Sequence, residues 1–359
     1  MYGKAFAPEY RGTLGELSVN TSLAEVLAKA VEERRRAEAD GSGVELAHAG
    51  LAVAEASRRL GLVEEAERAW KDSYRAARDA GDEGAMAWAM WSGGTLSRQR
   101  GHLALARRLL TRAAELAERG DDIVARGYCL AGLAETGRIQ GDYEAVGRLH
   151  EQLLAEARRR GEARHTVWAL EGIAQMHRNT GSFDRALALF EEAAHIAGEA
   201  GDDRGRAWAL RGIADVRSAQ GDAERALELL TEAETLCRAI QLVSALAYNH
   251  KMRGNVLFRA GRHAEAEECY SEALEEFRAM GEPRGEALAR LGLVKARARQ
   301  GWERQRTAAE LEELERAFAA IGLLRGGDMI DQARAELGIA DVDAGPAGSR
   351  AAADVAVIR

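Results

Sequence analysis

The chain has 359 residues, 47% of them hydrophobic and 30% charged, and its formal net charge is −8. This balance suits a water-soluble protein and argues against general nucleic-acid binding, which needs a strongly basic face. The N-terminus lacks the apolar run of a signal peptide, and no apolar stretch is long enough to cross a bilayer. We therefore expect a cytoplasmic protein with neither nucleic acid nor a membrane among its partners.

Helix is expected along nearly the whole chain. Only three prolines occur, and the sequence is rich in Ala, Leu, Glu and Arg, which favour helices. Residues 1–20 show no periodicity, whereas Thr21 or Ser22 can cap a helix over residues 23–40. Residues 1–43 are therefore predicted to form an irregular N-terminus followed by a capping helix.

From residue 44 onward, glycines divide the chain into segments of helical length. One set recurs every 40 residues: Gly61, Gly101, Gly141, Gly181, Gly221, Gly261 and Gly301. A second set lies about twenty residues out of phase: Gly81, Gly120, Gly161, Gly201, Gly281 and Gly322. Glycine suits points where a helix must stop and φ becomes positive. Several are followed by a residue that can cap the next helix: Asp142, Ser182, Asp202 and Asp222. The predicted repeat is helix A, turn, helix B, turn.

Two further columns mark helix B. A small residue stands five positions after each of the first six glycines of the first set: Ala66, Ala106, Val146, Ala186, Ala226 and Ala266. Four positions later the residue is mostly large: Trp70, Leu110, His150, Phe190, Leu230 and Tyr270. This order resembles the second half of a tetratricopeptide repeat, in a variant with a 40-residue unit. The resemblance implies an all-α, right-handed α-solenoid of about seven helix hairpins over residues 44–322.

The C-terminal end departs from this pattern. In the unit that begins at Pro283, Arg306 stands in the small-residue column. Glu313 stands where several earlier units have alanine (Ala113, Ala193, Ala233 and Ala273), and such departures are expected of a terminal repeat. Residues 323–339 are predicted to hold a capping helix, and residues 340–359 to be a disordered tail.

A column of mostly aromatic residues lies near the start of helix A. Its members, 40 residues apart, are His48, Trp88, Tyr128, Trp168, Trp208, Tyr248 and Leu288. Seven random positions would hold about 0.4 aromatics at the overall content of 5%. The resemblance places this column on the concave face of the superhelix, and residues three, seven and ten positions later share that side of the helix.

These columns together predict a ligand-binding groove. Its residues are Trp88, Trp91, Arg98, Tyr128, Glu135, Arg138, Trp168, Glu171, Gln175, Arg178, Trp208, Arg211, Asp215 and Tyr248. Aromatic rings offer stacking and cation–π contacts, and arginines bind carboxylates or phosphates. The expected occupant is a peptide or protein segment, or an aromatic or apolar small molecule. As alternatives, the rings pack between repeats, Glu171, Arg211 and Asp215 form a structural ion-pair network, and the arginines are solvated.

No catalytic motif is present, and the scattered Cys129, Cys237 and Cys269 form no metal-binding pattern, so neither metal nor cofactor is expected. The leading hypothesis is a non-catalytic binding protein. A second is an enzyme, for example of a bacterial specialised-metabolite pathway, with Glu135, Glu171 or Asp215 as acid or base. A third is a bacterial regulator that acts through a partner.

Overall fold

A computed structural model describes residues 23–323 and 325–339, and within these ranges it contains sixteen α-helices and no strand. The predictions for residues 1–20 and 340–359 lie outside the described residues. Seven hairpins follow one another between α2 (Leu23–Asp40) and α17 (Gly326–Leu337). The all-α solenoid is therefore confirmed. No helix in the described ranges is long and apolar enough to cross a membrane.

Each hairpin consists of an odd-numbered and an even-numbered helix. The odd-numbered helices are α3 (Gly43–Arg59), α5 (Glu83–Gln99), α7 (Ile123–Gln140), α9 (Ala163–Asn179), α11 (Asp203–Ala219), α13 (Val243–Arg259) and α15 (Pro283–Arg299). The even-numbered helices are α4 (Val63–Asp79), α6 (Leu103–Arg119), α8 (Tyr143–Arg160), α10 (Phe183–Ala200), α12 (Ala223–Ala239), α14 (His263–Ala279) and α16 (Arg304–Ala320).

The turns between helices use positive φ angles, as the glycine pattern predicted. All seven glycines of the first set adopt positive φ. In the second set Gly120 does not, and the next residue, Asp121, takes the left-handed conformation at φ 52°. Gln241, where the second set lacks a glycine, has φ 51°. The side chains of Asp142, Asp202 and Asp222 cap the following helices, whereas Ser182 makes no capping hydrogen bond.

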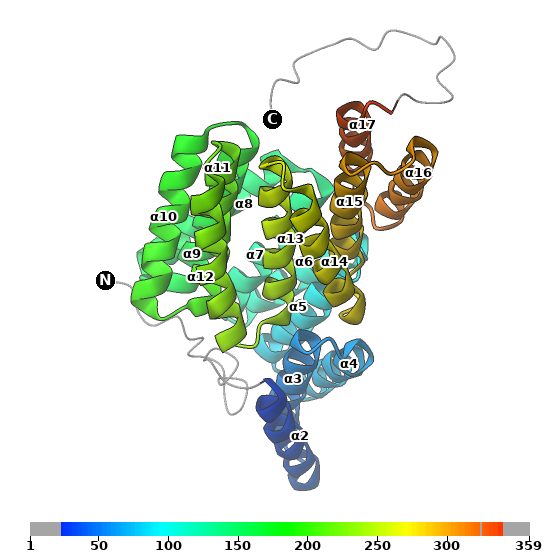
Figure 1. The fold of residues 1–359 in the computed structure, drawn as a ribbon. Coiled ribbons are helices and arrows are strands. Elements are labelled where there is room, and N and C mark those ends of the chain that lie inside the picture. Colours follow the sequence, from blue (N-terminus) through cyan, green and yellow to red (C-terminus); the bar gives the residue numbers. More distant parts are fainter. Residues whose placement is uncertain (1–22, 324, 340–359) are drawn as a thin grey trace, which may run out of the picture.

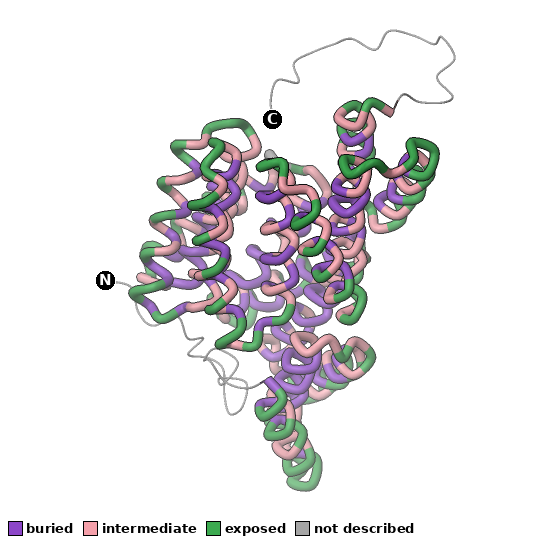
Figure 2. Tube along the Cα trace, viewed as in Figure 1, coloured by how far each residue is buried: buried purple, intermediate pink, exposed green. Residues whose placement is uncertain are grey.

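The odd-numbered helices form the inner layer of the solenoid (Figure 1). Each packs against the next odd-numbered helix, from α3 through α15, and also against the even-numbered helices on both sides. The odd-numbered helices are consequently richer in buried residues, and exposed residues gather on turns and outer helices (Figure 2). The surface of the odd-numbered helices that faces away from the even-numbered layer is called the inner surface below.

The superhelix returns on itself after five and a half repeats. A side chain placed on Gly61, in the turn after α3, would lie 3.5 Å from Cα of Met280, at the end of α14. One placed on Gly101, after α5, would lie 3.1 Å from Ile321 at the end of α16. The first hairpin thus approaches the sixth, and the second approaches the seventh, at their turns, so the odd-numbered helices wind around a common axis.

The large-residue column of helix B packs on small residues of the next odd-numbered helix. A β-carbon added to Gly212 would lie 2.3 Å from the ring of Phe190, and one added to Gly172 would lie 2.1 Å from the ring of His150. His150 is buried, and burial lowers its pKa to about 4, so it is a neutral packing residue. Adjacent hairpins therefore approach too closely for a side chain at these points.

Gly212→Ala is expected to destabilise the fold by about 1–3 kcal/mol, because the new methyl group overpacks the buried Phe190 ring. Gly198→Ala is the matched control, since that helical glycine has nothing within 4 Å of the added carbon. The control should be neutral or more stable by up to about 1 kcal/mol. Urea denaturation followed by circular dichroism measures both. Equal midpoints for the two variants would contradict this account of repeat packing.

Candidate functional site

Charged side chains from helices far apart in the chain face each other across the inner surface. Burial, followed by the positive fields of Arg59 and other arginines, lowers the pKa of Arg204 at the start of α11 to about 10. Arg59 lies on α3, so groups four repeats apart interact. Burial and the fields of Arg58 on α3 and Arg284 on α15 likewise lower the pKa of Arg98, against the opposing field of Glu135. The inner faces of the odd-numbered helices therefore converge on one region.

The aromatic column forms a series of ring contacts between repeats. Ring centroids of Trp88 and Tyr128 are 5.1 Å apart, and those of Tyr128 and Trp168 are also 5.1 Å apart. The series resumes at Trp208 and Tyr248, with 6.0 Å between centroids. These distances are typical of favourable aromatic pairs. The column therefore joins neighbouring repeats.

The two halves of this column differ in exposure. Trp88 is 3% exposed, and Trp91 and Tyr128 are 5% exposed, so these rings leave little surface for a ligand. Trp91 explains the difference, because it adds a second ring that packs edge-on against both Trp88 and Tyr128. Trp168, Trp208 and Tyr248 are only partly buried. Any ring surface open to a ligand therefore lies mainly in the C-terminal half.

Hydrogen bonds also fix this column to the next repeat. Trp88 Nε1–H donates to Asp122 at 2.8 Å, and the Tyr248 hydroxyl donates to Glu282 at 3.1 Å. Both acceptors are the N-capping residues of the next odd-numbered helix. Trp88 and Tyr248 therefore have a structural role, because their polar atoms hydrogen-bond to residues that cap the next odd-numbered helix.

The predicted ladder of arginines is largely neutralised by carboxylates. Arg138 binds Glu135 at 2.6 Å, and Arg98 lies 3.8 Å from the same carboxylate. Arg178 binds Asp215 at 2.8 Å. Asp215 also binds Arg259 at 2.9 Å, so the expected pair with Arg211 does not form. Because Arg178 and Arg259 already bind the Asp215 carboxylate, Arg211 makes no ion pair with it, although Arg211 is closer to Asp215 in the sequence.

Three cations of the inner surface lack any hydrogen-bond or ion-pair partner among the described residues. Arg204, Arg211 and Lys251 make no hydrogen bond or ion pair within the described part of the chain; we call them the cationic patch. The Arg211 guanidinium lies 3.6 Å from the Trp208 ring centroid, and that of Arg204 lies 5.6 Å from the Trp168 ring. Burial, followed by the field of Arg284, lowers the pKa of Lys251 to about 7. The patch thus offers positive charge beside partly exposed rings.

Glu171 does not neutralise this patch. Its Oε1 atom is buried without a hydrogen-bond partner, and no ion pair within 4 Å joins it to Arg211 among the residues described. Burial raises the pKa of Glu171 to about 8, although Arg211 and Arg204 act in the opposite direction. The pKa values of Glu135 and Asp215 are lowered, because arginines outweigh the effect of burial. Of these three carboxylates, only Glu171 is mainly protonated at neutral pH.

Glu171→Gln is expected to stabilise the protein as pH rises. The unfolded carboxyl ionises near pH 4.5, whereas the folded one stays protonated to about pH 8. The wild type therefore loses stability through this window, and glutamine does not ionise. The gain should be on the order of 4 kcal/mol at pH 7.5 and vanish below pH 4.5. Glu135→Gln should instead destabilise at pH 7.5, because its folded pKa is lowered. Denaturation midpoints between pH 4 and 8 that move in parallel for both variants would refute these assignments.

Sequence reasoning missed Arg204, although a signal for it exists. Four positions before the aromatic column, arginines occur at three of the repeats: Arg164, Arg204 and Arg284. Residues four apart lie on the same side of a helix, so this column also reaches the inner surface. Unlike Arg204, Arg164 already has polar partners: it lies 3.4 Å from the Asp202 carboxylate and 3.1 Å from the Tyr128 hydroxyl. The predicted residue Gln175 binds Asn179 on its own helix at 3.0 Å.

A groove of about 560 Å³ lies on the other side of α11, between α10 and α12. Its charged residues include Arg206, Arg217, Glu191 and Glu232. Arg206 binds Glu232 at 2.5 Å, and Arg217 lies 3.6 Å from Glu191. These charges are satisfied within the protein, in contrast to the cationic patch. The outer groove is therefore the weaker candidate for recognising a charged ligand.

Models of the tetratricopeptide repeat match residues 168–239 and 247–279. No curated protein matches the sequence. NprR in complex with its cognate peptide NprX is similar in structure, with a TM-score of 0.60 and 15% identity over 88% of this chain and 97% of that one. The Rap conjugation gene regulator of plasmid pLS20, in complex with the Phr* peptide, has a TM-score of 0.62 and 14% identity over 81% of this chain and 76% of its own. A Rap protein complexed with competence and sporulation factor has a TM-score of 0.57 and 13% identity over 90% and 98%.

Proposed function

Because this chain belongs to the tetratricopeptide repeat superfamily, we propose that it is a binding protein whose inner surface holds an acidic peptide segment. The observation that carries this proposal is the cationic patch. Among the residues that the structure describes, Arg204, Arg211 and Lys251 have no carboxylate partner, although the net charge of the chain is −8. Burying unpaired charge is unfavourable, and a bound carboxylate would relieve that cost.

The neighbouring rings define the rest of the proposed ligand. Trp168 and Trp208 present partly buried rings beside Arg204 and Arg211. Such rings bind apolar or aromatic side chains, while guanidinium groups bind carboxylates in a fixed geometry. A peptide with a Glu or Asp next to an apolar residue satisfies both.

A peptide is favoured over a small molecule for two reasons. Arg204 and Lys251 lie on α11 and α13, so the cationic patch extends over two repeats. The similar structures of NprR and of the pLS20 regulator also contain peptides, although their identity to this chain is only 15% and 14%. An extended segment places several side chains along successive repeats, which a compact small molecule does not.

Capture from matched peptide libraries tests this function. The immobilised full chain is offered two libraries of random hexapeptides that differ only in carrying Glu or Gln at two fixed positions. We expect selective retention of the Glu library and its release as salt screens the contacts. Equal retention of both libraries, or retention of neither, would rule out acidic-peptide binding.

A further inference from the structure

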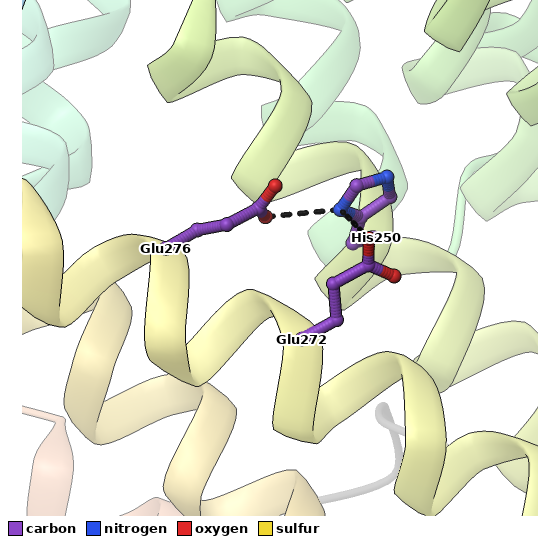
Figure 3. A group of neighbouring side chains, drawn as sticks. All are labelled: His250, Glu272 and Glu276. Atoms are coloured by element: carbon purple, nitrogen blue, oxygen red, sulfur yellow. Dashed lines mark hydrogen bonds and ion pairs between the residues drawn. The ribbon is translucent and has the colours of Figure 1, made fainter.

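Away from the inner surface, one histidine and two carboxylates converge between α13 and α14 (Figure 3). His250 lies on α13, and Glu272 and Glu276 lie on α14. The two glutamates are four residues apart, so their side chains project from the same side of the helix. His250 is 3% exposed, Glu276 is partly buried, and Glu272 is exposed. The cluster therefore reaches from a buried imidazole to a carboxylate at the surface.

The distances within this cluster fit a small coordination sphere. His250 Nδ1 lies 2.9 Å from a Glu276 oxygen and 3.6 Å from a Glu272 oxygen, and the three ligand atoms all lie within 4.8 Å of one another. Zinc bonds to nitrogen and oxygen are roughly 2.0–2.2 Å long, so ligand atoms around a tetrahedral ion are about 3.3–3.6 Å apart. Small rotations of the flexible glutamates would bring all three atoms to that spacing.

The second nitrogen of His250 also has a suitable neighbour. Nε2 lies 3.8 Å from a carboxylate oxygen of Glu234 on α12. Glu234 is held by Arg238 at 2.8 Å and by Arg253 at 3.4 Å. Histidines that bind a metal through one nitrogen commonly donate the other N–H to a carboxylate, which fixes the tautomer. Glu234 therefore stands where it can orient the His250 ring.

We propose that His250, Glu272 and Glu276 bind a first-row divalent transition metal ion such as Zn²⁺. One imidazole nitrogen with two carboxylate oxygens suits such ions, whereas Mg²⁺ and Ca²⁺ prefer oxygen ligands alone. Solvent water completes the coordination on the side of Glu272. The bound ion links the two helices of one hairpin, and Glu234 extends the contact to the preceding hairpin.

The electrostatics of the cluster agree with this assignment. Burial tends to lower the pKa of His250, but the hydrogen bond to Glu276 and the fields of Glu276, Glu272 and Glu234 raise it overall. The three carboxylates around the ring, those of Glu272, Glu276 and Glu234, thus favour a cation at this position, either a proton or a metal ion. A metal ion has the advantage that it engages both glutamates at once, which a single proton does not.

Calorimetric titration of the metal-free full chain with ZnCl₂ tests the proposal. The wild type should show one saturable site whose affinity is unaffected by millimolar MgCl₂. Glu272→Gln, at an exposed position that does not threaten folding, and His250→Gln should each weaken Zn²⁺ binding at least about tenfold. Bound Zn²⁺ should also raise the thermal midpoint of the wild type but not of these variants.

His195→Gln/Glu199→Gln is the matched control, because it removes a histidine and a carboxylate four residues apart on the surface of α10. It should bind Zn²⁺ like the wild type. Absence of saturable binding in the wild type would overturn the proposal. Wild-type affinity in Glu272→Gln would overturn it as well, since the ion would then be bound elsewhere, for example by cysteine.

Discussion

Replacing Arg204 and Arg211 together by glutamine is expected to weaken acidic-peptide binding about a hundredfold or more. Hydrogen bonds to charged groups contribute roughly 1.5–3 kcal/mol each, and 1.4 kcal/mol corresponds to a factor of ten in affinity. Neither arginine has a carboxylate partner within the described chain, so no internal ion pair is broken. The measurement is fluorescence polarisation with a fluorescein-labelled peptide selected from the Glu library.

The control for this double variant lies on the same helix. Arg206→Gln/Arg217→Gln removes two charges from α11, but both face the outer groove. Its affinity should equal that of the wild type. Because both variants lower the charge of the protein by two units, a general electrostatic effect would weaken binding equally in both. That result would contradict recognition by the inner surface.

Trp168→Ala/Trp208→Ala should abolish peptide binding while the helical content stays unchanged. Tryptophan buries a large apolar surface, and here each ring also lies beside a guanidinium group of the cationic patch. Removing both rings eliminates the stacking surface and releases Arg204 and Arg211 from their positions. Fluorescence polarisation measures the loss, and circular dichroism verifies the fold.

Trp302→Ala is the matched control for the aromatic double variant. Trp302 lies between α15 and α16, where its ring contacts Arg297 and Arg306. Like Trp168 and Trp208, Trp302 lies beside arginine side chains, but it is distant in the sequence from the residues of the cationic patch. Binding should be unchanged in this variant. If the Trp168→Ala/Trp208→Ala protein bound the peptide as tightly as the wild type, the rings would have only a packing role.

The fold could be predicted from the sequence because the solenoid depends on short-range signals. Each turn needs a residue with positive φ, and glycines such as Gly61, Gly141 and Gly221 mark these positions in the sequence. Each hairpin needs a small residue where its helices cross, and Ala66, Ala186 and Ala226 are all buried as expected. These signals recur along seven hairpins. A single departure, such as the positive φ at Asp121 instead of Gly120, therefore does not hide the pattern.

The contacts on the inner surface were less predictable, because pairing of charges depends on neighbours that the sequence does not place. The face of a helix follows from its period, but which arginine reaches Asp215 depends on the angle between hairpins. Arg259, which is more than forty residues from Asp215 in the sequence, forms the ion pair with Asp215 that was expected of Arg211. In the same way, burial of Trp88 depends on the extra ring of Trp91. Such contacts are properties of the assembled superhelix.

The histidine–carboxylate cluster illustrates the same point more strongly. His250 and Glu276 are 26 residues apart and belong to no motif of metal ligands. They meet because α13 and α14 pack as an antiparallel hairpin, with His250 facing α14. Only the folded hairpin reveals that an isolated histidine has two carboxylates beside it.

The most direct test of the central claim is a crystal structure of the full chain with the tightest-binding peptide of the Glu library. The account predicts a glutamate carboxylate of the peptide within about 3 Å of the Arg204 or Arg211 guanidinium, with an apolar side chain against Trp168 or Trp208. A peptide seated in the outer groove between α10 and α12, with the cationic patch untouched, would contradict it.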